Sequence, residues 1–147
     1  MKLSIQLALI AASLMISACA SVPMSDPKKD EEAKKFTTQK DMSRIYLYRN
    51  ETLGSAIKVP VTLNGKMKGE TAKNVYFAWD VKPGKHEVSC LASSNDTVSV
   101  NLKKNEIAYI WQEMKMGLMV AGCKLNIMEK EKAQKAITKT KLAKDSD

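Results

Sequence analysis

The sequence predicts an all-β fold, an antiparallel β-sandwich of about 7–8 strands followed by a C-terminal helix. Between residues 43 and 127, apolar and polar side chains alternate in several short segments, which is the period of a half-buried strand. Turn-forming residues separate these segments at intervals of roughly 8 to 12 residues, the spacing of sandwich strands. The Asn-Gly pair at residues 64–65 stands between two such segments and is typical of a tight hairpin.

The strands of the first half are expected over residues 44–49, 57–63, 66–71 and 74–81. In the first of them, Ile45 and Leu47 share one face and the tyrosines share the opposite one. Because Pro60 has no N–H to donate, the second strand is expected at a sheet edge or with a bulge.

The strands of the second half are expected over residues 86–92, 97–102, 106–116 and 118–128. Alternation assigns one set of side chains to the core face, namely Val75, Phe77, Trp79, Val81, Val88, Cys90, Val98, Val100 and Leu102. In the last strand a single face carries Met119, Ala121, Cys123, Leu125 and Ile127.

The sandwich is expected to have a polar segment on each side. Residues 19–42 carry many charges and few large apolar side chains, so they are interpreted as a tether, with a short surface helix from Pro27 to about Lys35. Residues 128–147 are expected to form a helix and tail with a thin apolar stripe. The lysine-rich face of this helix is interpreted as solvated surface rather than as a contact with an anionic partner.

Residues 1–18 are interpreted as an export signal. Lys2 supplies a positive charge, and the run from Leu3 to Ala18 is uncharged and mostly aliphatic. This run is shorter than the roughly 20 residues that a spanning helix needs. The alternatives are an uncleaved anchor helix and an ordinary signal peptide, for which "SACA" offers a cleavage site.

The stretch "ISAC", residues 16–19, resembles the lipobox of bacterial lipoproteins, which reads aliphatic, small, small, Cys. The resemblance implies that the signal peptide is removed before Cys19, which carries the acyl chains as a lipid anchor. In enterobacterial lipoproteins an Asp after the cysteine retains the protein in the inner membrane. Ala20 at this position therefore implies an outer-membrane protein that faces the periplasm of a Gram-negative host.

The segment from "VPVTLNGKMKGET" to "NVYFAWDVKPGKHEVSC" reads strand, Asn-Gly hairpin, strand, aromatic strand, Pro-Gly turn, strand. This order resembles PEGA-type surface repeats and, more closely, a family of Gram-negative lipoproteins described as domain of unknown function 2846. "RIYLYRN" at 44–50, "LNG" at 63–65 and "KPGKHEV" at 82–88 match that family. The resemblance covers about residues 43–127 and implies an immunoglobulin-like or PEGA-like sandwich on a lipid anchor, with no catalytic residues to carry over.

The formal net charge of +8 is spread along the chain. An excess of lysines favours contact with lipid headgroups, lipopolysaccharide phosphates or peptidoglycan carboxylates, but scattered lysines also keep a surface soluble, and we favour the second interpretation. For an exported protein, nucleic acid is not an expected partner.

With Cys19 acylated, Cys90 and Cys123 are the remaining thiols. An even pair in an oxidising compartment predicts a disulfide. Closing this loop of about 34 residues is worth roughly 3 to 4 kcal/mol in the chain-entropy model. The alternative is two buried free thiols.

No constellation of catalytic residues is found in the sequence, and no enzyme activity or cofactor is expected. The single histidine, His86, follows a Pro-Gly turn and is interpreted as a polar turn residue, because no nucleophile-elbow signature accompanies it. The spacings of zinc ligands and of a phosphate-binding loop are absent, so no metal is expected.

A sulfur-rich stretch offers an alternative function. It contains Met114, Met116, Met119, Cys123 and Met128. Thioethers favour Cu(I), which makes an accessory copper-handling protein the second hypothesis. Core filling is the preferred interpretation, because these methionines alternate as strand residues do.

Tyr46, Tyr48 and Tyr76 fall on the faces opposite the core stripes. Together with nearby Lys and Arg they are a possible binding face for a glycan or a partner protein, against the alternative of ordinary cross-strand packing. The functional hypothesis is therefore a non-catalytic, membrane-anchored envelope lipoprotein whose sandwich binds another envelope component.

Overall fold

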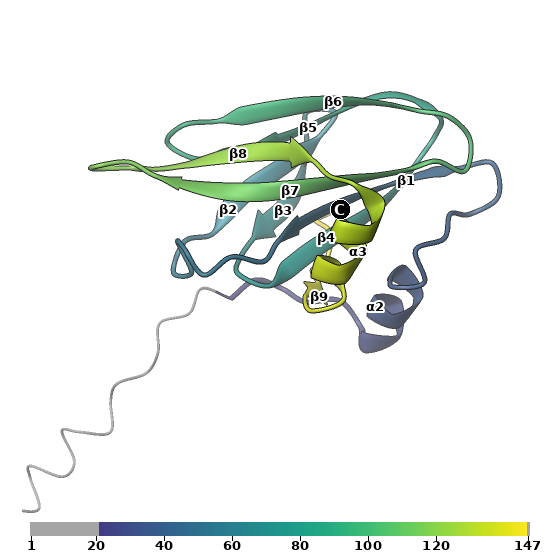
Figure 1. Ribbon diagram of the computed structural model, residues 1–147, viewed down its shortest axis with the longest axis horizontal. Coiled ribbons are helices and arrows are strands. Elements are labelled where there is room, and N and C mark those ends of the chain that lie inside the picture. The colour runs from purple at the N-terminus through teal and green to yellow at the C-terminus, as the bar shows by residue number, and fades with distance from the viewer. Residues whose placement is uncertain (1–20, 147) are drawn as a thin grey trace, which may run out of the picture.

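The computed structural model describes residues 21–146, and Figure 1 shows two β-sheets packed face to face. The five-stranded sheet has the order β8-β7-β1-β4-β9, and the four-stranded sheet has the order β3-β2-β5-β6. The strands are β1 Ser43–Arg49, β2 Val59–Leu63, β3 Lys66–Thr71, β4 Val75–Val81, β5 Gly84–Cys90, β6 Asp96–Leu102, β7 Ile107–Met116, β8 Ala121–Ile127 and β9 Lys141–Leu142. The helices are α2 Pro27–Ala33 and α3 Lys130–Ile137.

The predicted fold class is confirmed, with one difference in how the strands pair. Most neighbours are antiparallel, but β1 pairs with β7 in parallel, and β4 pairs with β9 in parallel. The five-stranded sheet is therefore mixed. Alternating hydrophobicity reveals which face of a strand is buried, but it says nothing about which strand lies beside it.

The main core lies between the two sheets. Val75, Phe77, Trp79 and Val81 of β4 all belong to it, as their alternation predicts. They pack with side chains from both sheets, including Ile45, Leu47, Val59, Val61, Val88, Cys90, Val100 and Leu102. Two side chains of the face predicted for the last strand are exposed: Ile127 is 60% exposed at the end of β8, and Met119 is 93% exposed before β8 begins.

The first hairpin has the predicted turn. Asn64 and Gly65 adopt φ values of 51° and 77°, the left-handed conformation that a two-residue hairpin turn requires. Pro60 lies on an inner strand, not at an edge, and its own pairing with Glu70 is regular, so neither expectation for Pro60 is met. The register of β2 and β3 shifts after Val61, where Lys68 of β3 is the extra residue. Pairing of β2 with β5 begins only at Val61, so the missing N–H of Pro60 falls where that ladder ends.

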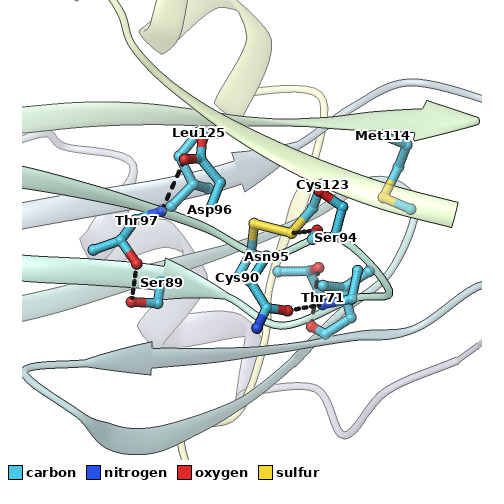
Figure 2. The surroundings of a disulfide bond; sticks show 12 residues. Thr71, Ser89, Cys90, Ser94, Asn95, Asp96, Thr97, Met114, Cys123 and Leu125 are labelled. Atoms are coloured by element: carbon cyan, nitrogen blue, oxygen red, sulfur yellow. Dashed lines mark hydrogen bonds between the residues drawn. A yellow bond between two sulfur atoms is a disulfide. The ribbon is translucent and has the colours of Figure 1, made fainter.

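A disulfide joins the two sheets, as Figure 2 shows. It links Cys90 at the end of β5 to Cys123 of β8, with the two Cα atoms 6.3 Å apart. The connection between β5 and β6 also hydrogen-bonds the outer edge of β8: Cys123 N–H donates to the Ser94 carbonyl at 3.1 Å, and Leu125 N–H donates to Asp96 Oδ2 at 2.8 Å. This edge of the five-stranded sheet is therefore covered and cross-linked.

The segment interpreted as a tether is packed on the sandwich from Ser21 onward, which corrects the expectation for residues 21–42. Val22 is buried, Met24 pairs with Ala143, and Ala33 is buried against the sheet. The short helix was predicted correctly: Asp26 caps α2 by accepting a hydrogen bond from Lys28 N–H at 2.8 Å. Few large apolar residues are needed here, because polar contacts provide much of the attachment.

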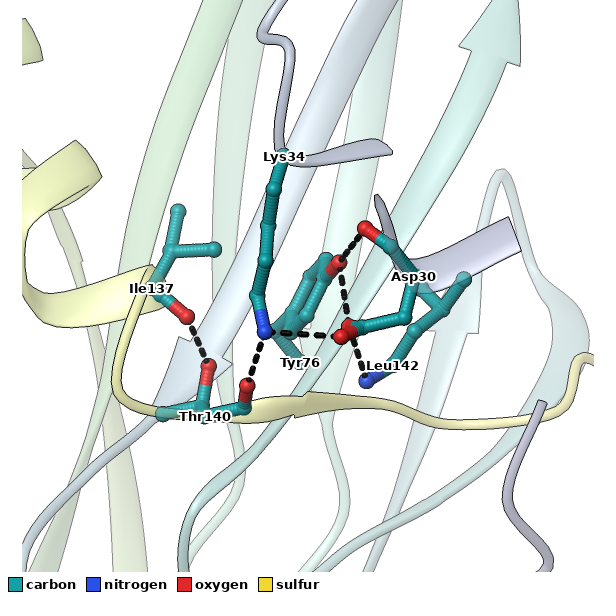
Figure 3. A network of polar contacts seen from close by, with 6 residues as sticks. All are labelled: Asp30, Lys34, Tyr76, Ile137, Thr140 and Leu142. Atoms are coloured by element: carbon teal, nitrogen blue, oxygen red, sulfur yellow. Dashed lines mark hydrogen bonds and ion pairs between the residues drawn. The ribbon is translucent and has the colours of Figure 1, made fainter. Parts of the chain in front are cut away.

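The central polar contact is a network around Asp30 of α2, shown in Figure 3. Its Oδ1 accepts hydrogen bonds from the Tyr76 hydroxyl at 2.8 Å and from Leu142 N–H at 2.9 Å. Its Oδ2 accepts one from Lys34 Nζ at 2.8 Å, and Lys34 Nζ also donates to the Thr140 carbonyl at 2.7 Å. Burial raises the pKa of the Asp30 carboxyl, but these hydrogen bonds outweigh it and hold the pKa below its ordinary value of 3.8.

The C-terminal segment is also part of the sandwich. After α3, residues 141–142 form β9 at the outer edge beside β4, and Ser146 N–H then donates to the Lys68 carbonyl of β3 at 2.9 Å. Lys68 Nζ is paired with Asp145 at 2.6 Å. Every sheet and core contact described above is made by residues 21–146, so a chain that begins at Ser21 contains all the residues that make them.

Replacing both Cys90 and Cys123 by alanine in the chain that begins at Ser21 is expected to lower its free energy of unfolding by about 3 to 4 kcal/mol, because the unfolded chain gains freedom. Urea denaturation monitored by circular dichroism measures the change. The unmodified chain should lose similar stability in reductant. An unchanged midpoint in reductant contradicts the prediction.

Replacing Asp30 by Asn is expected to lower the free energy of unfolding by about 1 to 3 kcal/mol at pH 7, because the charged hydrogen bonds are lost. Since the pKa of Asp30 is lower in the folded state, its contribution is fully present above pH 3.8 and disappears as the pH falls through the folded-state pKa. Urea denaturation from pH 7 to pH 2 should therefore show the two curves converging in acid. Glu31→Gln, on the exposed side of the same helix, is the control, and a difference that stays constant down to pH 2 contradicts the prediction.

Candidate binding site

The outer face of the five-stranded sheet carries an aromatic layer beneath the two helices. It contains Tyr46, Tyr48, Tyr76 and Tyr109, with Phe36 and Trp111 packed against them. The rings of Tyr46 and Tyr109 stack with centroids 5.4 Å apart, and Phe36 lies 5.4 Å from Tyr46. This layer forms a second core.

The aromatic layer corrects the predicted binding face. Tyr46, Tyr48 and Tyr76 do lie opposite the main core, but they are at most 2% exposed and present no open platform. The reason is that α2 and α3 lie over them, which a strand pattern does not reveal.

Most of the tyrosine hydroxyls are satisfied inside the fold. Tyr46 donates to the Ala33 carbonyl at 2.6 Å, Tyr76 donates to Asp30, and Tyr109 accepts from Gln134 Nε2 at 2.7 Å. Burial raises the pKa of the Tyr76 phenol, and its hydrogen bond to Asp30 adds to that rise. Tyr48 differs: burial alone raises the pKa of its phenol, and within residues 21–146 its hydroxyl makes no hydrogen bond.

Tyr48 is at the base of a pocket of about 300 Å³ between β1, β7 and α3, which we call the lysine pocket. Its lining consists of Tyr48, Asn50, Trp111, Met128, Lys132, Lys135, Ala136 and Lys139. The floor is aromatic and apolar, and the rim on the side of α3 is basic. Lys132, Lys135 and Lys139 share one face of the chain there, because three or four residues make one helical turn.

The electrostatics of the lysine pocket favour an anion. Within residues 21–146, none of its three lysines forms an ion pair, and no carboxylate lines it. The neutral donors among the lining residues are the Tyr48 hydroxyl, the Asn50 amide and the Trp111 indole N–H, which is buried without a partner among the described residues. Aromatic faces below and ammonium groups above suit a ring-shaped ligand that carries a carboxylate or phosphate.

A larger groove of about 680 Å³ lies beside α2. Lys28 and Lys29 line it without an ion pair among the described residues, but the charged groups at its base are paired with each other. At its base, Arg44 binds Asp80 through two hydrogen bonds of 2.7 and 3.0 Å. Gln39 Nε2 also donates to Asp80, at 3.1 Å. The Asp80 hydrogen bonds raise the pKa of the Arg44 guanidinium. These groups attach the segment before β1 to the sheet, and we assign the groove a structural role.

The sulfur-rich stretch is not assembled into one site. Met114 is 2% exposed in the main core, and Met128 lies in the lysine pocket. Met116 and Met119 point into solvent at the tip of the β7–β8 hairpin, and Cys123 is in the disulfide. Among the described residues, His, Cys, Asp and Glu form no cluster of three or more that could hold a metal ion.

His86 joins two turns. Its Nε2 lies 2.7 Å from the Lys82 carbonyl, and its Nδ1 lies 2.9 Å from Asn64 Nδ2 in the first hairpin. The Asn64 side chain also accepts a hydrogen bond from Glu87 N–H at 2.9 Å. The histidine therefore fastens the β2–β3 turn to the start of β5.

Cys19 and the predicted signal at 1–18 lie outside the described residues. Of the two helices in the described part of the chain, neither is long and apolar enough to cross a bilayer.

The lysine pocket was not predicted from the sequence. Its lysines were visible as a basic helical face, but nothing in the sequence places that face over Tyr48 and Trp111. The sequence did contain a hint of this pocket, because one short domain combines a lysine-rich helix with a tyrosine-bearing outer sheet face.

Comparison with known proteins finds a matching family and a similar protein from another organism. A family described as "Protein of unknown function (DUF2846)" matches residues 39–123. An uncharacterized protein of Haemophilus influenzae is 33% identical over 137 residues, which cover 92% of this chain and 82% of that protein.

Proposed function

The chain belongs to the DUF2846 family, and from its sequence, its fold and its lysine pocket we propose that it is a non-catalytic, membrane-anchored lipoprotein that binds an acidic glycan of the cell envelope. The observation that carries the binding role is the lysine pocket, where unpaired lysines surround an aromatic floor. The anchoring role rests on the apolar run from Leu3 to Ala18 and on Cys19 directly after it.

In this proposal, Cys19 carries the acyl chains and the domain stays at the outer membrane, facing the periplasm. Ala20 after the cysteine supports that location, because the Asp that resembles an inner-membrane retention signal in enterobacterial lipoproteins is not at this position. Several acyl chains, each methylene contributing about 0.8 kcal/mol when buried in lipid, make such an anchor stable.

The ligand class follows from the chemistry of the pocket. A sugar ring stacks on the half-buried Trp111, and its carboxylate or phosphate pairs with Lys132 and Lys135. Peptidoglycan fragments carry carboxylates next to sugar rings, so they are the first acidic glycans to test. The copper-handling alternative gains no support, because the sulfur atoms are spread over a core, a pocket, a disulfide and a hairpin tip.

The anchor is tested by Cys19→Ser in the full chain. We expect the variant to lose labelling by radioactive palmitate and to keep its signal segment, so that it migrates as a larger protein than the mature form. Metabolic labelling and gel electrophoresis of membrane fractions measure both effects. If Cys19→Ser is labelled and processed like the unmodified chain, the lipoprotein assignment is wrong.

The lysine pocket is tested by calorimetric titration with soluble muropeptides, which are acidic, and with chitotriose, a neutral sugar of related structure. We expect muropeptides to bind more tightly, and the double variant Lys132→Gln/Lys135→Gln to weaken that binding about tenfold without affecting chitotriose. The matched control is Lys124→Gln/Lys130→Gln, which removes equal charge outside the pocket.

The glycan-binding role is overturned if both double variants have equal affinity for muropeptides, or if the unmodified chain does not bind them. The non-catalytic role is overturned if mass spectrometry detects cleavage products of the muropeptides.

A further inference from the structure

The chain enters the domain at one particular end of the sandwich. Ser21 lies beside Lys73, Asn74 and Val75, where β4 begins. Val75 pairs with Arg49, the last residue of β1. We call this the anchor end, defined by Ser21, Arg49 and Val75.

The β7–β8 hairpin projects from the same end. Because β7 runs parallel to β1, with Trp111 beside Tyr48, its last residues continue past Arg49. From Trp111 to Met116 the strand extends by roughly 17 Å at 3.4 Å per residue. Figure 1 shows the hairpin tip at the left and the first described residues at the lower left.

The anchor end is unusually apolar for an exposed surface. At the hairpin tip, Leu118 and Met119 are fully or almost fully exposed, at 105% and 93%, with Met116 and Val120 about half exposed beside them. Leu53, in the loop between β1 and β2, is 51% exposed, and Met24 is 42% exposed. That loop joins the end of β1 to Val59, which pairs with Thr71 just before β4, so it also lies at this end.

Few large apolar side chains are exposed elsewhere in the described part of the chain. Met67 lies in the β2–β3 hairpin at the opposite end, and Ile127 lies beside Ile110 in the middle of β7. Clustered exposed apolar groups mark a surface that is covered by something else. Lys73 and Lys141, near Ser21, add positive charge that suits anionic headgroups.

From these observations we infer that the anchor end lies on the lipid bilayer, with the β7–β8 tip inserted among the acyl chains and the lysines near Ser21 at the headgroups. The inference rests on the anchor proposed above. Only Ala20 separates Cys19 from Ser21, so a lipid on Cys19 holds Ser21 within about 7 Å of the bilayer surface. At that distance, a projecting apolar tip on the same end reaches the lipid.

The methionine methyl groups provide a direct test. A chain that begins at Cys19 is coupled through that thiol to a maleimide lipid in nanodiscs of phosphatidylethanolamine and phosphatidylglycerol. Chemical coupling makes the result independent of acylation in cells, so failure of this inference and failure of the anchor are distinguishable. Spin-labelled acyl chains in the nanodisc are expected to broaden the methyl signals of Met116 and Met119 several-fold more than that of Met67. Equal broadening, or broadening of Met67 alone, overturns the inference.

A matched pair of variants tests the contribution of the tip. In the chain that begins at Ser21, Leu118→Ser/Met119→Ser is expected to lower partitioning into vesicles of the same lipids about tenfold. Met67→Ser/Ile127→Ser removes exposed apolar groups elsewhere and is expected to change partitioning less than about twofold. All four positions are exposed, so folding should be preserved, and circular dichroism verifies it. The inference is overturned if the two pairs of substitutions change partitioning equally. It is also overturned if sedimentation shows that the tip binds a second copy of the chain instead of lipid.

Discussion

One carboxylate holds the outer layer of this domain together. Asp30 accepts hydrogen bonds from α2, β4 and β9, three segments that are far apart in the sequence. Because Lys34 Nζ donates to both Asp30 and the Thr140 carbonyl, α2 and the segment that leads into β9 are positioned by the same contact. The helices can then cover the aromatic layer, and the position of α3 in turn creates the lysine pocket.

The sandwich could be predicted where information is local. The turn at Asn64 and Gly65, the core face of β4 and the pairing of Cys90 with Cys123 each follow from residue type or spacing, and all are present. Both helices of the flanking segments were predicted, but the segments were misjudged as a tether and a free tail, because much of their contact with the sheet is polar. A charged segment such as 26–35 has the composition of a solvated linker until its hydrogen-bond partners are known.

The binding face predicted at Tyr46, Tyr48 and Tyr76 also could not be judged from local sequence alone. Alternation correctly separated Tyr46, Tyr48 and Tyr76 from the core, but an outer face is exposed only if no helix covers it. Whether the tyrosines are covered depends on where α2 and α3 pack on the sheet, and contacts between distant segments decide this. The lysine pocket forms where the edge of the aromatic layer, at Tyr48 and Trp111, meets the lysine-bearing face of α3.

The position of β9 has a consequence for how the chain matures. Residues 141–142 follow all the other described strands along the chain, yet they complete the five-stranded sheet and supply a donor to Asp30. Until this segment has left the ribosome, Asp30 lacks one of its donors and the outer layer has no closing strand. The outer layer is therefore consolidated only after α3 and β9 have been synthesised, later than the eight strands that precede them in the described part of the chain.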